Sequence, residues 1–174
     1  MEPARRGFLK RAFAVTLGAV SGLIPFGAGL AVFLDPLRRS AASTPFVRVT
    51  SLESLPPDGI PRKFPVIARR SDAWTTTPDA RIGAVYLRRL ADGTLQAFNV
   101  TCPHAGCFVE FAGLTEGYRC PCHDSSFTLD GAIKNPGSPS PRGLDELETE
   151  IRNGADVWVK YQKFLPGHDS KIPA

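Results

Sequence analysis

The longest apolar run of the chain lies near its N-terminus. Twenty-three residues without a charge, Ala12 to Leu34, follow a basic stretch that reads Arg5-Arg6-Gly7-Phe8-Leu9-Lys10-Arg11. A helix rises about 1.5 Å per residue, so this run reaches about 34 Å, enough to cross a hydrocarbon core of about 30 Å. The pattern therefore predicts one transmembrane helix within residues 1–39.

After residue 45, short apolar runs alternate with turn signals. Asp92-Gly93, Asp130-Gly131 and Asn153-Gly154 each lie between two such runs, as in a β-hairpin. We expect strands at Phe46–Thr50, Phe64–Arg69, Ile82–Arg89, Thr94–Val100, Phe108–Phe111, Tyr118–Cys120, Phe127–Lys134, Leu147–Arg152 and Val157–Phe164. Residues 46–174 are thus predicted to form one antiparallel all-β domain, a sandwich or barrel, after a linker at residues 40–45.

Composition and charge narrow the classes of function. Gly and Pro, sixteen of each, suit short strands and turns better than a helical bundle. The net charge of +4 lies within residues 1–39, whereas residues 40–174 hold fifteen basic and fifteen acidic side chains. A nucleic-acid-binding surface needs basic and aromatic residues gathered on the body, so we expect no nucleic-acid partner. The basic residues before the apolar run favour a cytoplasmic N-terminus.

The cysteines and histidines gather in two short loops. The first reads Cys102-Pro-His104-Ala-Gly-Cys107 and the second reads Cys120-Pro-Cys122-His123. Thiolates and imidazoles brought together by two loops are typical of a metal site. Two Cys and two His would also suit a tetrahedral zinc ion, although zinc modules usually pair Cys-x-x-Cys with His-x-x-x-His. A structural zinc module therefore stays open as an alternative.

These two loops resemble those of a Rieske protein, in which each loop gives one Cys and one His to a [2Fe–2S] cluster. The resemblance implies a Rieske-type antiparallel β fold with a cluster-binding subdomain and one cluster per chain. Cys102 and Cys120 would hold one iron, and His104 and His123 the other, which takes the electron. Proton uptake by the outer imidazole nitrogens would be linked to reduction. By the same resemblance, His123 is expected to contact quinol.

The resemblance also assigns the two remaining cysteines. Cys107 and Cys122 correspond to the disulfide that ties the loops together in the quinol-oxidising branch of the family. A structural disulfide persists outside the reducing cytosol. A pair of buried free thiols is the alternative.

Three residues of the second loop bear on the reduction potential. High-potential Rieske proteins have Ser two residues and Tyr four residues after the second His; here these are Ser125 and Phe127. One hydroxyl donor to the cluster is therefore missing, and we expect a lower potential that suits menaquinol. Asp124 replaces a Gly, and its carboxylate should lower the potential further unless it turns to solvent.

The remaining candidates have plainer interpretations. Gly137-Ser-Pro139-Ser-Pro141 resembles the proline loop that covers the cluster in the family, or is a rigid surface turn. His168 has no matching Cys and is expected to be solvated. Asp145-Glu146-x-Glu148-x-Glu150 is expected to form a solvated face, and Trp74 and Trp158 to pack in the core or at an edge.

The N-terminus resembles a twin-arginine export signal, on the residues Arg5-Arg6-Gly7-Phe8-Leu9-Lys10. Such signals send folded proteins across a membrane. Ser40-Ala41-Ala42 is a candidate cleavage site, but the apolar run is longer than a usual signal of about 7–15 residues. We therefore expect a retained single-pass anchor in the cytoplasmic membrane, with the Rieske domain on the periplasmic side.

Together these features predict the iron–sulfur subunit of a respiratory cytochrome bc-type complex. It would be an electron carrier within an oxidoreductase, taking an electron and a proton from quinol at a cytochrome b-type subunit and reducing a c-type cytochrome. The main alternative is the Rieske small subunit of a periplasmic molybdoenzyme such as arsenite oxidase.

Overall fold

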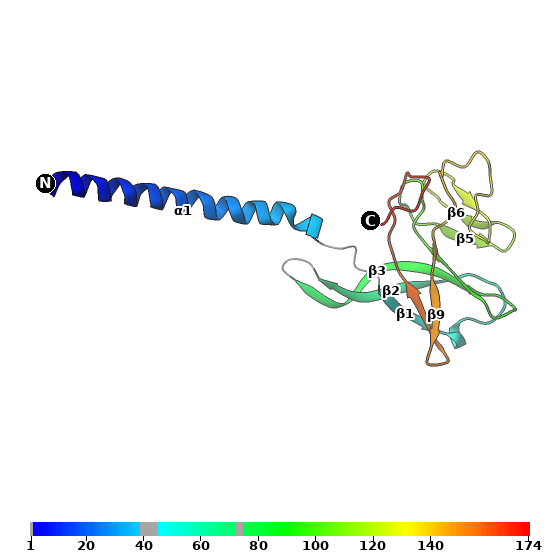
Figure 1. Cartoon of the computed structure of the whole chain (residues 1–174). Helices are drawn as coiled ribbons and strands as arrows, with labels where there is room; N and C mark the ends of the chain where they lie inside the picture. The colour runs from blue at the N-terminus through cyan, green and yellow to red at the C-terminus, as the bar shows by residue number, and fades with distance from the viewer. Residues whose placement is uncertain (1, 39–44, 72–74) are drawn as a thin grey trace. The chain divides into compact units, whose positions relative to one another are not determined.

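The computed structural model describes residues 2–38, 45–71 and 75–174, in two separate units. Helix α1, Glu2–Arg38, forms the first unit (Figure 1). Its segment Arg5–Asp35 contains an 18-residue stretch with a mean hydropathy of 2.0 and is long and apolar enough to cross a membrane. The Thr16 hydroxyl donates to the carbonyl of Ala12 within the helix, so this polar group is satisfied without water.

The second unit, residues 45–174, is built of antiparallel strands arranged in three sheets. The strands are β1 (Phe46–Ser51), β2 (Arg62–Ser71), β3 (Thr76–Arg89), β4 (Leu95–Asn99), β5 (Glu110–Gly113), β6 (Gly117–Arg119), β7 (Ser126–Phe127), β8 (Glu146–Leu147), β9 (Thr149–Arg152) and β10 (Asp156–Lys160), with a 3-10 turn at Leu52–Ser54. The sheet orders are β1-β10-β9, β2-β3-β4-β8 and β5-β6-β7. The prediction of an antiparallel β fold is confirmed.

The middle of the four-stranded sheet is apolar on both faces, because it lies between two cores. Along β3, Val85 and Leu87 belong to the core shared with β10, whereas Ala84 and Tyr86 belong to the core shared with β6. Successive side chains of a strand point to opposite faces, so this alternation places one core on each side of the sheet. The small sheet β5-β6-β7 therefore stands on the far side of the middle sheet from β10.

Several predicted strands need correction. β3 begins at Thr76, six residues before the expected start. The strand expected over Phe127–Lys134 ends at Phe127, and Asp130-Gly131 lies in a turn closed by the bridge between Phe127 and Ile133. The Gly131 amide instead donates to Thr128, and its carbonyl accepts from Leu144. Backbone groups in this stretch are thus satisfied by turns, which apolar alternation does not reveal.

The acidic stretch is not a uniformly solvated face. Glu146, Glu148 and Glu150 are exposed, as expected, but Asp145 is 2% exposed and therefore buried. Its carboxylate pairs with Arg142, three residues earlier in the chain. The expectation for Asp145 was wrong because a buried carboxylate can be retained when it is fully paired.

Trp158 is half-buried on β10, the central strand of its sheet, where the Arg152 guanidinium stacks 4.5 Å from its ring centroid. Trp158 therefore lies neither in the two cores nor at a sheet edge, because it packs against Arg152 on the outer face of the central strand. Trp74, the candidate cleavage site Ser40-Ala41-Ala42 and all but the last residue of the predicted linker at 40–45 lie outside the described residues.

Candidate metal centre

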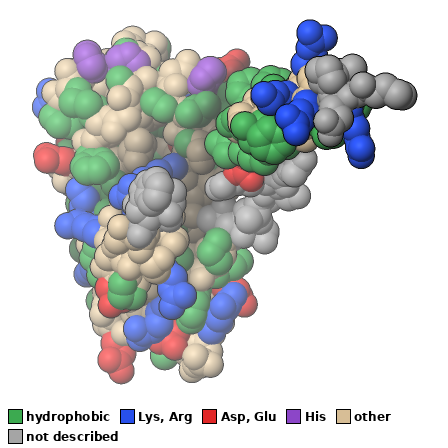
Figure 2. Space-filling model, turned by 90° about the vertical axis from the view of Figure 1, so that its left-hand side faces the viewer, with side chains coloured by type: hydrophobic (Ala, Val, Ile, Leu, Met, Phe, Trp, Pro, Cys, Tyr) green, Lys and Arg blue, Asp and Glu red, His purple; other side chains and the backbone are tan. Residues whose placement is uncertain are grey.

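Two loops at one end of the β unit carry the clustered cysteines and histidines. The first loop, residues 102–107, connects β4 to β5, and the second loop, residues 120–125, connects β6 to β7. Figure 2 shows histidine side chains (purple) gathered at the upper end of this unit. The small sheet β5-β6-β7 supports both loops, because one loop enters β5 and the other leaves β6.

The two loops have the same backbone turn. In the first, the Cys102 amide donates to the Cys107 carbonyl at 2.7 Å, and the Gly106 amide donates to Cys102 at 3.0 Å. In the second, the Cys120 amide donates to Ser125 at 2.8 Å, and the Asp124 amide donates to Cys120 at 3.1 Å. The fifth residue has positive φ in each, +81° at Gly106 and +59° at Asp124. Glycine adopts this left-handed conformation freely, and Asp tolerates it better than most residues.

The thiols and the imidazoles differ in burial. Cys102 and Cys120 are each 1% exposed and are not in a disulfide. His104 is half-buried and His123 is exposed, and their ring centroids lie 4.8 Å apart. The structure therefore brings together all four predicted ligands, with sulfur inside and imidazole at the surface.

The donor set fits a two-iron cluster. The Nδ1 atom of His104 is buried and has no hydrogen-bond partner among the described residues. An unpartnered buried nitrogen is costly unless it binds something, and a ligand atom of iron is such a case. Two thiols on one side and two imidazoles on the other are the mixed ligand set of a Rieske centre.

The surroundings of Cys102 oppose its ionisation in the absence of a metal. Burial is the largest cause and raises the pKa of this thiol; the His104 amide and the Ser125 hydroxyl lower the pKa in part, and the neighbouring Cys120 thiol raises it again. Ser125 is fully buried beside Cys102, but its hydroxyl makes no well-directed hydrogen bond within the described residues. A bound cation would stabilise the Cys102 thiolate, and a negatively charged sulfur is an acceptor for the Ser125 hydroxyl.

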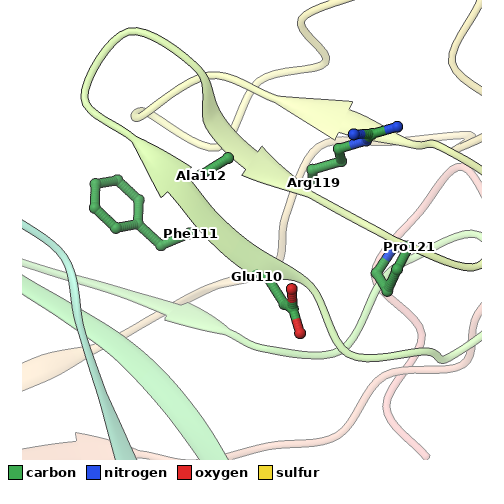
Figure 3. A pocket seen from close by; sticks show the side chains of 5 residues that line it. All are labelled: Glu110, Phe111, Ala112, Arg119 and Pro121. Carbon is green, nitrogen blue, oxygen red and sulfur yellow. The ribbon is translucent and has the colours of Figure 1, made fainter.

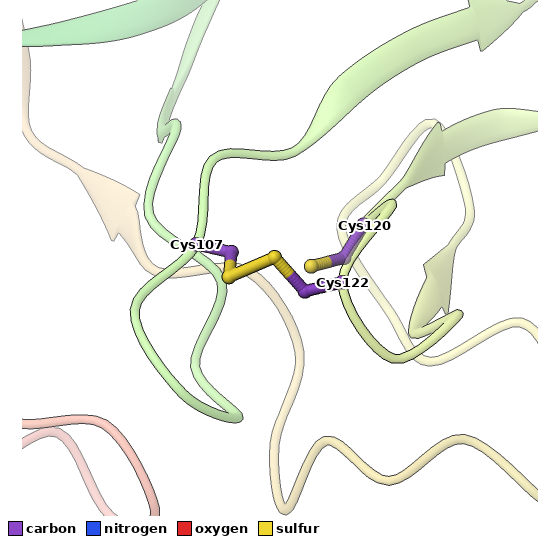
Figure 4. A group of neighbouring side chains, drawn as sticks. All are labelled: Cys107, Cys120 and Cys122. Carbon is purple, nitrogen blue, oxygen red and sulfur yellow. A yellow bond between two sulfur atoms is a disulfide. The ribbon is translucent and has the colours of Figure 1, made fainter.

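Cys107 and Cys122 form a disulfide between the two loops, as predicted. The Sγ atoms of Cys107, Cys120 and Cys122 all lie within 4.8 Å of one another. Figure 4 shows the Cys120 thiol beside the disulfide. Because two of these sulfurs are bonded to each other, this trio is not a separate metal site. The disulfide holds the second loop against the first.

The Asp124 side chain turns to solvent, so the condition under which its carboxylate would not lower the reduction potential is met. Its carboxylate accepts from the Arg119 Nε atom at 2.6 Å, and the two side chains are 72% and 67% exposed. The negative charge next to His123 is thus paired and hydrated. Its effect on a nearby redox centre should be small, because water screens exposed charges.

We expect Asp124→Asn to raise the reduction potential by only about 10–20 mV, since Asn also tolerates positive φ and an exposed charge acts through water. Arg119→Gln is the matched control and should lower the potential by a similar amount. Redox titration of both proteins measures the shifts. A rise above about 60 mV for Asp124→Asn would show that the carboxylate acts directly on the metal centre.

A surface pocket of about 370 Å³ lies beside the second loop. Figure 3 shows Glu110 and Phe111 on β5, Arg119 on β6, and Pro121 of the loop around it. The four predicted ligands are not among the described residues that line it. His168 is exposed, as expected for a residue that is not a ligand.

Comparison with known proteins agrees with this geometry. The family model described as the Rieske [2Fe-2S] domain matches residues 51–149, more than half of the chain. The chain belongs to the Rieske family. A Rieske-type [2Fe–2S] cluster is therefore its cofactor, and the zinc module is excluded.

Curated relatives of this Rieske protein are iron–sulfur subunits of cytochrome b6-f complexes. The subunit 1 of Nicotiana tabacum chloroplasts is 31% identical over 99 residues, covering 55% of this chain and 42% of the relative. The subunit of Chlorobaculum tepidum is 34% identical over 65 residues, covering 37% of this chain and 35% of the relative. The chain thus matches about two fifths of the length of these relatives.

One solved structure similar to this chain is that of the cyanobacterial plasma membrane Rieske protein of Synechocystis PCC 6803. It is 22% identical and has a TM-score of 0.45, covering 66% of this chain and 99% of that chain. No comparison bears on the resemblance of residues 5–10 to a twin-arginine signal, which stays a prediction.

Proposed function

We propose that this Rieske protein is the electron-transfer subunit of a respiratory quinol:cytochrome c oxidoreductase. The observation that supports this most is the loop pair itself, with buried thiols, surface imidazoles and a disulfide between the loops. The helix α1, long and apolar enough to span a membrane, supports attachment beside a membrane-embedded partner. The names of the curated relatives support a partner of the cytochrome b type.

Each ligand has a proposed role. Cys102 and Cys120 would hold the inner iron through their buried sulfurs, and His104 and His123 the outer iron. When bound, the cluster supplies a one-electron redox centre with a potential of roughly −150 to +300 mV. His123, the more exposed imidazole, would present its outer nitrogen to quinol and accept the proton there. Ser125 would donate its buried hydroxyl to the cluster side of the loop.

The membrane arrangement is part of the proposal. The N-terminus would lie in the cytoplasm and the Rieske domain, residues 46–174, on the periplasmic side, where the Cys107–Cys122 disulfide is stable. Residues 1–39 would serve as twin-arginine signal and retained anchor. Quinol, here menaquinol, would be oxidised between this domain and cytochrome b, and a c-type cytochrome would accept the electron.

Membranes that contain the intact chain should reduce a c-type cytochrome with menaquinol as donor. His123→Ala should abolish this activity, whereas the control His168→Ala, at an exposed residue, should retain it. The solubilised protein should also co-purify with a b-type haem protein. Co-purification with a molybdenum enzyme instead would favour the arsenite oxidase-like alternative and overturn the quinol assignment.

Phe127→Tyr tests the expected low potential. Phe127 is fully buried in the core that contains Cys102 and Cys120, so a hydroxyl on its ring would add a donor beside the cluster. We expect the potential to rise by about 50 mV, the equivalent of one hydrogen bond of about 1 kcal/mol. Redox titration measures it, with Phe111→Tyr at the edge of the same core as control. An unchanged potential would refute the role of a missing hydroxyl.

A further inference from the structure

Arg142 and Asp145 form a buried ion pair outside the two loops. The Arg142 Nε and Nη2 atoms each donate to one carboxylate oxygen of Asp145, both at 2.9 Å. The side chains are 9% and 3% exposed. A two-pronged contact of this kind fixes the plane of the guanidinium as well as its position. The remaining donors of Arg142 therefore point in a defined direction.

Those donors reach the C-terminal segment, residues 164–174. Arg142 Nη1 donates to the carbonyl of His168, and Nη2 donates to that of Leu165 at 3.2 Å. The segment is folded back on itself by a bond from the Leu165 amide to Ile172 at 2.9 Å and by the bridge between Phe164 and Pro173. Arg142 thus holds one end of a closed hairpin-like segment.

The same segment contacts the first loop. The Gly167 amide donates to the carbonyl of Pro103 at 2.7 Å. Pro103 is buried and lies between Cys102 and His104 in the chain. A side-chain carbon on Gly106 would stand 3.8 Å from Pro166 Cγ, and one on Gly167 would stand 3.8 Å from the His104 carbonyl. The segment therefore rests on the backbone that joins two predicted ligands.

We infer that Arg142 is a positioning residue for the first loop, acting through the C-terminal segment. The order of contacts is Asp145, Arg142, residues 165–168 and then Pro103, and each link is a hydrogen bond. The second loop is held to the first by the disulfide, whereas the first loop has this additional support. That this support of the first loop matters for electron transfer rests on the proposed function.

Hydrogen exchange of the full-length holoprotein tests the inference. The Cys102 and Gly106 amides of the first loop have equivalents in Cys120 and Asp124 of the second, so each protein carries its own reference. In Arg142→Met, and after deletion of residues 165–174, we expect exchange at Cys102 and Gly106 to rise by about tenfold or more. Exchange at Cys120 and Asp124 should change less than about twofold.

Arg48→Met is the matched control, because Arg48 pairs with Asp156 between β1 and β10. It should leave exchange in both loops unchanged. Arg142→Lys keeps the charge without the two-pronged contact and should fall between the original protein and Arg142→Met. If Arg142→Met does not fold, the deletion and Arg142→Lys still decide the matter.

Unchanged exchange in the first loop, or an equal rise in both loops, would overturn the inference. The electron paramagnetic resonance spectrum of the reduced protein separates this result from a failure of the proposed function. Loss of support should alter the spectrum in Arg142→Met but not in Arg48→Met. Normal spectra with no quinol oxidation in any of the proteins would instead refute the proposed function and leave the exchange result standing.

Discussion

Replacement of Cys102 by serine is expected to yield a folded protein without a [2Fe–2S] cluster. Serine fits the buried site, but its hydroxyl does not ionise at neutral pH and cannot replace the thiolate that holds iron. The same loss is expected for Cys120→Ser, since the two thiols are buried side by side. Iron and acid-labile sulfide per chain measure the result.

The same experiment can be carried out on the two predicted histidine ligands. His104→Ala and His123→Ala should also lose the cluster, and His168→Ala should keep the iron and sulfide content of the original protein. Circular dichroism of the β domain checks that each variant is folded. A cluster retained in Cys102→Ser or in His123→Ala would contradict the proposed ligand set, and loss in His168→Ala would show that the assay reports general damage.

Removal of the disulfide is expected to have the second large effect. The double variant Cys107→Ser/Cys122→Ser opens a bridge between cysteines 15 residues apart. By loop entropy, a closed loop of this length stabilises the folded state by about 3 kcal/mol. The two loops would then be linked by the cluster and by the sheet β5-β6-β7 from which they extend, without a covalent bond between them, so the variant should release iron at lower denaturant concentrations.

Guanidinium titration, followed by the visible absorbance of the cluster, measures this change. Reduction of the disulfide in the original protein is the matched control and should produce a similar shift. The double variant should not respond to the reductant. If the double variant is as stable as the original protein, the disulfide does not support the metal centre.

A Rieske-type cluster could be predicted from the sequence because rare residue types gather in two short loops. Thiols and imidazoles bind metals in few alternative ways, and Gly and Pro in the loops indicate turns. The structure brings together the four predicted ligands, Cys102, His104, Cys120 and His123. The left-handed turn at Asp124 could have been predicted too, because Gly106 follows Cys102 by the same four positions. The glycine at position 106 indicates the left-handed turn at 124 only when the two loops are aligned on Cys102 and Cys120.

Other features depend on tertiary contacts that alternation does not encode. The stretch after Phe127 has the composition of a strand, but its backbone partners are turns and a distant residue, Leu144. Asp145 belongs to an alternating acidic pattern, yet it is buried because Arg142 satisfies both of its oxygens. In the sequence, only Arg142, three residues before Asp145, indicates a possible ion pair, and this indication is weaker than the alternating glutamates, which suggest a solvated strand.

The shared backbone turn of the two loops has a consequence for design. The backbone turn after Cys102 has the same hydrogen bonds as the turn after Cys120. The fifth residue, Gly106 in one turn and Asp124 in the other, can therefore differ while the backbone stays the same. Glycine at 124 and asparagine at 106 should therefore both be accommodated without rebuilding the neighbouring strands. The main-chain turn is the part that the two loops share, whereas the side chains on it differ in position, with His104 two residues after Cys102 and His123 three residues after Cys120.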